Sequence, residues 1–183
     1  STRGLAVVAG FNISNTVANL FNVVFIALGS AISIIVGQQL GAGKLEEAVD
    51  TDRKMIVFSV FCCLVIGACM FAIAPFFPRI YNTTEEVRGL AKQFIRIASA
   101  CMPLYGFMHA TYFTLRSGGK TVITFLFDSV YVWVVDIPLA FVLTRFTGLP
   151  IVPIYLSCQL IEIIKCIIGY VMVKKKIWVN NMV

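Results

Sequence analysis

Charged residues are scarce in this sequence. They make up 13% of its 183 residues, about half the share found in an ordinary soluble domain. Apolar residues make up 59%, and the mean hydropathy is +0.90. This composition excludes a soluble globular domain and favours a chain that lies mostly within a lipid bilayer. The net charge of +6 does not indicate a nucleic-acid partner, because the basic residues are spread between apolar stretches rather than gathered on one face.

Residues that commonly bind metals or perform catalysis are also few. His109 is the only histidine, and the six cysteines fall in apolar stretches without a CxxC pair. We therefore expect the cysteines to pack as small apolar residues. No nucleophile, acid pair or metal-ligand cluster gathers near one end of the apolar stretches, so the sequence predicts no catalytic site, no metal site and no organic cofactor.

The chain begins Ser-Thr-Arg-Gly without an initiator methionine, and we expect it to be a fragment of a longer protein. A helix needs about 20 residues to cross a bilayer. Five apolar stretches reach that length, over residues 5–38, 55–78, 88–115, 121–146 and 149–173. The sequence therefore predicts an all-α integral membrane protein, with residues 1–183 forming one domain of five transmembrane helices. Thr83 and Glu86 have the spacing of a capping box before the third span.

Basic residues indicate how these spans are oriented, because lysine and arginine are in excess on the cytoplasmic side. One side carries Lys44, Arg53, Lys54, Arg116, Lys120, Lys174, Lys175 and Lys176. The other side carries Arg3, Arg79, Arg88, Lys92 and Arg145. We therefore predict an external N-terminus and a cytoplasmic C-terminal tail, with Trp178 as an anchor at the membrane interface.

Four amides lie deep in the first apolar stretch. They recur every three or four residues, which places them on one face of a helix. They are Asn12, Asn15, Asn19 and Asn22. Lipid cannot satisfy these groups, so they either line a solvated cavity or bond to neighbouring helices. We favour the cavity, because four amides on one face exceed what packing requires.

The third stretch carries a second polar face. It consists of Tyr105, His109, Tyr112 and Arg116, at i, i+4, i+7 and i+11. The tyrosine rings suit an aromatic or cationic ligand. His109 either exchanges a proton near neutral pH or simply bonds to a neighbouring helix, and the sequence leaves both roles open.

The last two stretches hold three acids, Asp128, Asp136 and Glu162. A charge at the bilayer centre costs about 2.5–3.5 kcal/mol, so such groups are functional candidates by default. Pro138 should kink or break the helix beside Asp136, and Asp136 could instead cap a helix that restarts there. Glu162 could instead form a purely structural ion pair with Lys165.

The segment from Gly37 to Ala48, GQQLGAGKLEEA, resembles a cytoplasmic segment of the multidrug and toxic compound extrusion (MATE) family. Further residues follow the spacing of the last three helices of its prokaryotic members. They are the segment from Leu115 to Thr121, then Asp128, Trp133, Pro138, Glu162, Lys165 and Trp178. The resemblance implies a twelve-helix transporter of two six-helix lobes, in which this chain supplies helices eight to twelve and the missing N-terminal lobe is its partner.

The resemblance also implies a function. Small organic, often cationic compounds would be exported across a bacterial inner membrane in exchange for inward Na⁺ or H⁺. Some family members have a cation-binding acid in the helix that matches the third span, but no acid lies between Gly89 and Arg116 here. Asp128, Asp136 and Glu162 therefore remain the ion-coupling candidates.

The implied mechanism is alternating access, in which two lobes rock about a central cavity. The amide face, Tyr105, His109 and Tyr112 would line that cavity. Two alternatives stay open at this point. One is a flippase for lipid-linked oligosaccharides from the same superfamily, and the other is an integral-membrane enzyme.

Overall fold

The computed structural model describes residues 4–179, with Phe127 described by its backbone alone. The first three long helices are α1 (Leu5–Gly41), α2 (Leu45–Ile73) and α3 (Glu85–Ser117), and a 3₁₀ turn, Phe77–Ile80, precedes α3. The helical segment that follows comprises α4 (Thr121–Phe125), the π-helical turns η2 (Leu126–Val130) and η3 (Val132–Asp136), and α5 (Ile137–Phe146). The last helix is α6 (Ile151–Lys174). The described residues contain no strand, and the predicted all-α class is confirmed.

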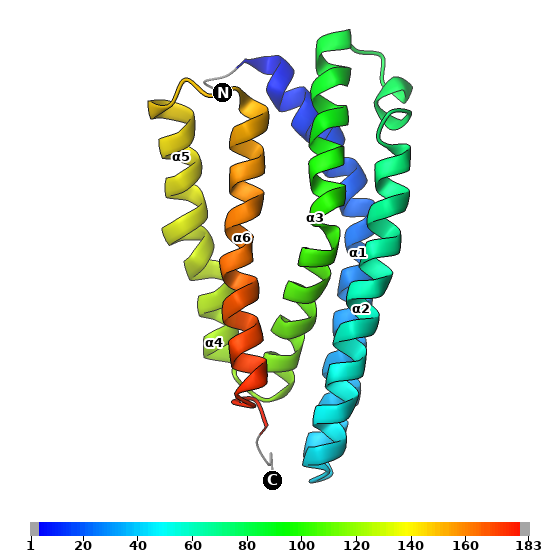
Figure 1. Ribbon diagram of the computed structural model, residues 1–183, viewed down its shortest axis with the longest axis vertical. Coiled ribbons are helices and arrows are strands. Elements are labelled where there is room, and N and C mark those ends of the chain that lie inside the picture. The colour runs from blue at the N-terminus through cyan, green and yellow to red at the C-terminus, as the bar shows by residue number, and fades with distance from the viewer. Residues whose placement is uncertain (1–3, 180–183) are drawn as a thin grey trace.

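The helices run back and forth along one long axis, and the two ends of the chain lie at opposite ends of the bundle (Figure 1). Four segments are long and apolar enough to cross a membrane by length and composition: α1, α2, residues 121–146 and α6. The remaining predicted span lies within α3, which is equally long but more polar. Because α3 packs against α1, α2 and α6, neighbouring helices shield its polar side chains from lipid. Arg3, one of the basic residues counted above, lies outside the described residues.

The outer faces of the helices are strongly apolar. Trp133 is 72% exposed, Phe146 74% and Leu20 68%. Soluble monomers rarely expose large continuous apolar surfaces, whereas lipid solvates them. The observed helices and their apolar exteriors fit an integral membrane protein, as the composition predicted.

Helix boundaries differ from the predicted spans mainly at α2. This helix begins at Leu45, ahead of the predicted 55, with Glu46 and Glu47 in its first turn, where acids interact favourably with the helix dipole. It ends at Ile73, before the predicted 78, because Pro75 lacks the N–H needed to continue it. The cap of α3 is Thr84 rather than Thr83: the Thr84 hydroxyl accepts a hydrogen bond from the Val87 N–H at 3.4 Å.

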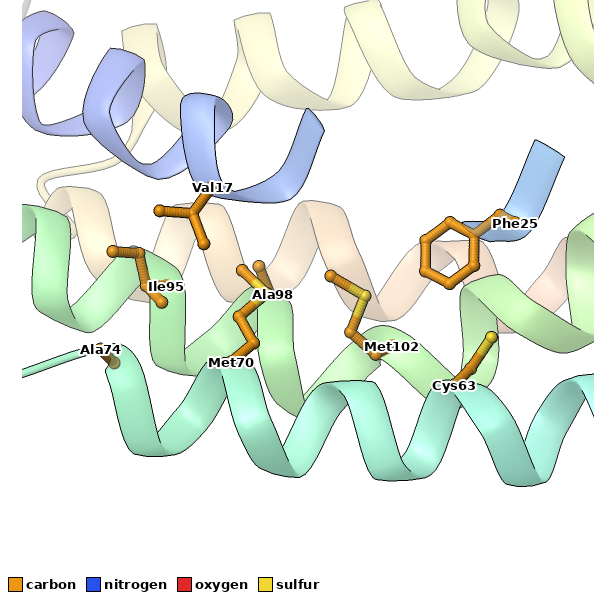
Figure 2. Close-up of a cluster of buried hydrophobic side chains, with 8 residues drawn as sticks. All are labelled: Val17, Phe25, Cys63, Met70, Ala74, Ile95, Ala98 and Met102. Atoms are coloured by element: carbon orange, nitrogen blue, oxygen red, sulfur yellow. The ribbon is translucent and has the colours of Figure 1, made fainter. Parts of the chain in front are cut away.

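One hydrophobic cluster joins α1, α2 and α3. Figure 2 shows its side chains pointing into the space between the three helices. The cluster consists of Val17, Phe25, Cys63, Met70, Ala74, Ile95, Ala98 and Met102. Since a lipid environment gives little hydrophobic drive for helix association, close contact of small residues matters more here than in a soluble core. Gly67 and Gly106 provide that contact between α2 and α3.

We expect Gly67→Ala to lower the free energy of unfolding by about 1–3 kcal/mol, the usual cost of overpacking. A Cβ at Gly67 would lie only 2.7 Å from the Ser99 carbonyl oxygen, so α2 and α3 must separate. The matched control is Gly37→Ala on α1, where no described atom lies within 4 Å of the added Cβ. That variant should be neutral or gain up to about 1 kcal/mol of helix propensity. Thermal unfolding in detergent measures both, and equal stability of the two variants would contradict the close packing of α2 on α3.

Trp178 is buried among other side chains, so the prediction that its ring is an anchor exposed to the membrane interface is wrong. Its side chain is 1% exposed and belongs to a second hydrophobic cluster, with Ile32, Leu40 and Leu115. The indole N–H donates to the Val173 carbonyl at 3.4 Å. Gly118, in the turn after α3, makes room for Trp178, since a Cβ there would lie 2.1 Å from the Trp178 carbonyl oxygen.

Candidate functional site

Three of the four predicted amides line a single cavity. Its volume is about 270 Å³, and the amides are Asn15, Asn19 and Asn22 of α1. The spacing of three and four residues brings them to one face, which turns toward α3 and α6. Asn12 is exposed and is not among the residues that line this cavity, although its backbone carbonyl accepts a hydrogen bond from Thr16 at 3.0 Å. We call this space the amide cavity.

Opposite the amides, α3 contributes Tyr105 and His109. The Nδ1 atom of His109 lies 3.0 Å from the Tyr105 carbonyl oxygen. A carbonyl only accepts, so Nδ1 carries the proton, and a neutral ring then presents Nε2 as an acceptor. The ring also packs on Phe25, with 5.6 Å between centroids. The sequence left two roles open for His109, proton exchange or a structural hydrogen bond. The contacts with the Tyr105 carbonyl and Phe25 hold the ring in one orientation.

A hydrogen-bonded chain crosses from α3 to α6 at the amide cavity. The Tyr105 hydroxyl donates to Gln159 Oε1, and Gln159 Nε2 lies 2.7 Å from the Tyr155 hydroxyl, to which it donates. Tyr155 packs between Phe94 and Phe11, with ring centroids 4.9 Å and 6.0 Å away. Tyr155 was missed at the sequence level. The signal was present, because Tyr155 lies four residues before Gln159 and seven before Glu162 on the same helix.

Lys165 lies beside the cavity between two acids. Its side chain is 5% exposed, and Nζ lies 3.0 Å from Glu162 Oε2 and 3.6 Å from Asp136 Oδ2. Nζ also lies 4.5 Å from the centre of the Tyr131 ring, a cation–π contact. The Tyr131 hydroxyl donates to the Ile161 carbonyl at 2.9 Å, which fixes the ring against α6. Asp136, Glu162 and Lys165 therefore form one cluster, in which Lys165 is buried and the two acids are partly buried. It is called the acid–lysine cluster below.

The acid–lysine cluster is not fully satisfied within the described residues. Asp136 Oδ1 is buried and has no hydrogen-bond partner there, whereas both carboxylate oxygens of Glu162 lie within 3.1 Å of Lys165 Nζ. Two carboxylates face a single ammonium, so a negative charge is left over when both acids are ionised. Buried charge without compensation is costly. The arrangement therefore favours the binding of a proton or a further cation.

The alternative role of Asp136 as a helix cap is wrong. Its backbone is helical, with φ −69° and ψ −47°, and its side chain makes no capping hydrogen bond. The segment 121–146 does not break at Pro138. Instead the two π-helical turns η2 and η3 precede the proline, and such turns rearrange the hydrogen-bond ladder without ending the helix. The expected ion pair between Glu162 and Lys165 is present, but it extends to Asp136.

Asp128 and Tyr112 line a neighbouring cavity of about 290 Å³. Arg116 lies in the same wall, and Asp128 itself is exposed. This cavity and the amide cavity share Met108, His109 and Lys165. The predicted residues are thus divided between two adjoining cavities. Asp136 lines neither cavity but pairs with Lys165, which lines both, and Asn12 also lines neither cavity.

Comparison with known proteins supplies an independent observation. The MatE family model matches residues 1–142. The probable multidrug resistance protein YoeA of Bacillus subtilis (strain 168) is 23% identical over 153 residues, which cover 81% of this chain and 32% of that protein. A probable multidrug resistance protein NorM of Oceanobacillus iheyensis is 26% identical over 139 residues, covering 72% of this chain and 30% of that protein.

A third relative, the probable multidrug resistance protein NorM of Halalkalibacterium halodurans, is 24% identical over 150 residues. Those residues cover 81% of this chain and 32% of that protein. This chain therefore spans about a third of the length of the curated relatives it matches. No solved structure matches it.

Proposed function

From the premise that this chain belongs to the MatE family, we propose that it forms part of a multidrug efflux transporter that exports organic cations by antiport. Members of this family are transporters and not enzymes. The apolar helices and the bacterial relatives support a multi-pass protein of the plasma membrane. The rest of the transporter, including a first lobe facing this one, would supply the opposite wall of the substrate path.

The observation that carries the proposal is the amide cavity. Amides from α1, the phenol of Tyr105 and the imidazole of His109 meet there beside the carboxylate of Glu162. Amide oxygens and aromatic faces stabilise a positively charged, partly apolar compound without binding it as tightly as a full ion pair would. Such a surface accepts compounds of different shapes, which is what multidrug export requires.

The acid–lysine cluster supports the choice of antiport. Asp136 and Glu162 share one ammonium group, so an additional cation is accommodated at the cluster. A proton or Na⁺ held there neutralises the excess charge, and an arriving organic cation in the adjoining cavity disfavours it by repulsion. Exchange of one cation for the other then links transport to the ion gradient. Asp128, exposed in the neighbouring cavity, is the third coupling candidate.

Alternating access would act on this arrangement as a change in which side of the membrane the cavities face. The segment 121–146 suits such a movement, because Asp128 lies within the first of its π-helical turns and Asp136 ends the second. π-Helical turns are frequent at functional sites and locally weaken the regular helix. A shift in these turns would change the distance from Asp136 to Lys165 while α6 remains in place.

We expect Asn15→Leu and Asn19→Leu to reduce export of a cationic dye by about tenfold each, the effect of losing about 1.4 kcal/mol of binding. Leucine removes the amide oxygen from the cavity wall at nearly unchanged size. The measurement is dye efflux by cells that express the natural protein containing this chain, normalised to the amount inserted in the membrane. Asn12→Leu is the matched control, since Asn12 is on the same helix but does not line the cavity. If all three variants exported dye like wild type, the amides would serve only to hold helices together.

A further inference from the structure

A separate cavity lies between α2 and α6, toward the end of the bundle where α6 terminates. Its volume is about 510 Å³, and Phe107 of α3 contributes to its wall. Most of the lining is apolar, with Val49, Ile56, Val57, Tyr170, Val173 and Trp178 among its residues. Val57 is 65% exposed and Tyr170 53%, so the cavity opens onto exposed apolar faces of α2 and α6.

The same cavity carries an excess of positive charge. Arg53, Lys174 and Lys176 line it, and within residues 4–179 none of them forms an ion pair. The single carboxylate in the wall is Asp52, which is 1% exposed and accepts a hydrogen bond from Thr114 at 2.5 Å. Three cations therefore face one acid, and that acid is directed to α3.

The backbone turn after α6 places the side chain of Lys176 at the cavity. Lys176 has φ 53°, and among the described residues it is the only non-glycine with positive φ. A lysine in the left-handed region is unfavourable and persists only where surrounding contacts hold it. Trp178, packed beneath Gly118, provides such a contact two residues later. The turn after α6 thus brings a third cation to the cavity mouth.

We propose that this cavity binds the phosphate headgroup of an anionic phospholipid, with the acyl chains lying along the exposed apolar faces of α2 and α6. Arginine binds phosphate through two parallel N–H donors, and the lysines add point charges. Basic pockets between transmembrane helices are suited to anionic headgroups. A phospholipid satisfies both halves of the cavity, whereas a soluble anion would leave the apolar wall and the lipid-facing opening unused.

The test uses Trp178 as a reporter, because this residue belongs to the cavity wall. The natural protein containing this chain is prepared with Trp178 as its only tryptophan, and Trp133 among those changed to phenylalanine. It is placed in phosphatidylcholine vesicles with rising fractions of brominated phosphatidylglycerol or brominated phosphatidylcholine. We expect the anionic lipid to quench Trp178 fluorescence at a mole fraction at least about tenfold lower than the neutral lipid.

Charge variants then identify the residues responsible. The triple variant Arg53→Gln, Lys174→Gln and Lys176→Gln should lose the preference for anionic lipid, and Lys174→Arg with Lys176→Arg should keep it. A matched control, Lys44→Gln, Lys54→Gln and Lys175→Gln, removes three charges from the same end of the protein but none from the cavity lining, and should also keep it. Circular dichroism confirms that each variant is folded.

Three results would overturn the proposal. The first is equal quenching of the wild-type protein by both lipids, and the second is an unchanged preference in the folded triple Gln variant. The third is relief of quenching by millimolar inorganic phosphate, which would make the cavity a site for a soluble anion rather than for a lipid.

Discussion

Lys165→Met is expected to lower the free energy of unfolding by about 3 kcal/mol, toward the lower end of the range for losing one partner of a buried pair. Methionine retains the length of the side chain but removes the ammonium that lies between Glu162 and Asp136. The two partly buried carboxylates would then lack a cation between them, and the Tyr131 ring would also lose its cation. Unfolding in detergent, followed by circular dichroism, measures the loss.

Two comparisons separate the loss of charge balance from the loss of packing. Lys54→Met removes a lysine from an exposed pair with Asp50, whose side chains are 75% and 63% exposed, and should change stability by no more than about 0.5 kcal/mol. Adding Asp136→Asn and Glu162→Gln to Lys165→Met removes the uncompensated charge and should restore most of the stability. If Lys165→Met were as stable as Lys54→Met, the acid–lysine cluster would not be a buried charge network.

Much of the fold could be predicted from the sequence, because membrane helices are encoded locally. Each long apolar stretch contains enough residues to cross a bilayer, and prolines and glycines mark where helices end. The predicted span 121–146 coincides with the observed helical segment. The third predicted span, 88–115, lies in the more polar helix α3, which is central and whose neighbours make its polar residues tolerable.

The candidate site was predictable only in part. Spacing along one helix places Asn15, Asn19 and Asn22 on one face, and these three do line one cavity. Spacing cannot show which residues of different helices meet. The Glu162–Lys165 pair could be read from one helix, whereas its link to Asp136 depends on the packing of the segment 121–146 against α6.

Trp178 illustrates the same difference between local and tertiary information. A tryptophan just after a basic tail is typical of an interfacial anchor. Its burial depends on the space left by Gly118, sixty residues earlier in the chain. Asp52 was not singled out for the same reason, because its position at the end of a charged segment gave no sign of its buried hydrogen bond to Thr114.

We expect neutralisation of the coupling acids to abolish export driven by an ion gradient while leaving substrate binding intact. Asp136→Asn, Glu162→Gln and Asp128→Asn keep the size and much of the hydrogen-bonding capacity of each side chain, but none of them can bind a proton or carry the negative charge that attracts Na⁺. Gradient-driven transport by Asp136→Asn or Asp128→Asn should fall at least about tenfold, which corresponds to about 1.4 kcal/mol. Asp50→Asn, which removes an exposed acid on α2, is the matched control and should transport normally.

The decisive measurement is uptake of a fluorescent organic cation into vesicles that contain the natural protein in inside-out orientation, driven separately by an imposed H⁺ gradient and an imposed Na⁺ gradient. Equilibrium binding of the same dye is measured in parallel. Antiport through these acids predicts that at least one gradient drives uptake by wild type and by Asp50→Asn. It also predicts that neither gradient drives uptake by the combined Asp128→Asn, Asp136→Asn and Glu162→Gln variant, although that variant still binds the dye. Uptake by the combined variant at the wild-type rate would contradict antiport through these acids and would place ion coupling outside this chain.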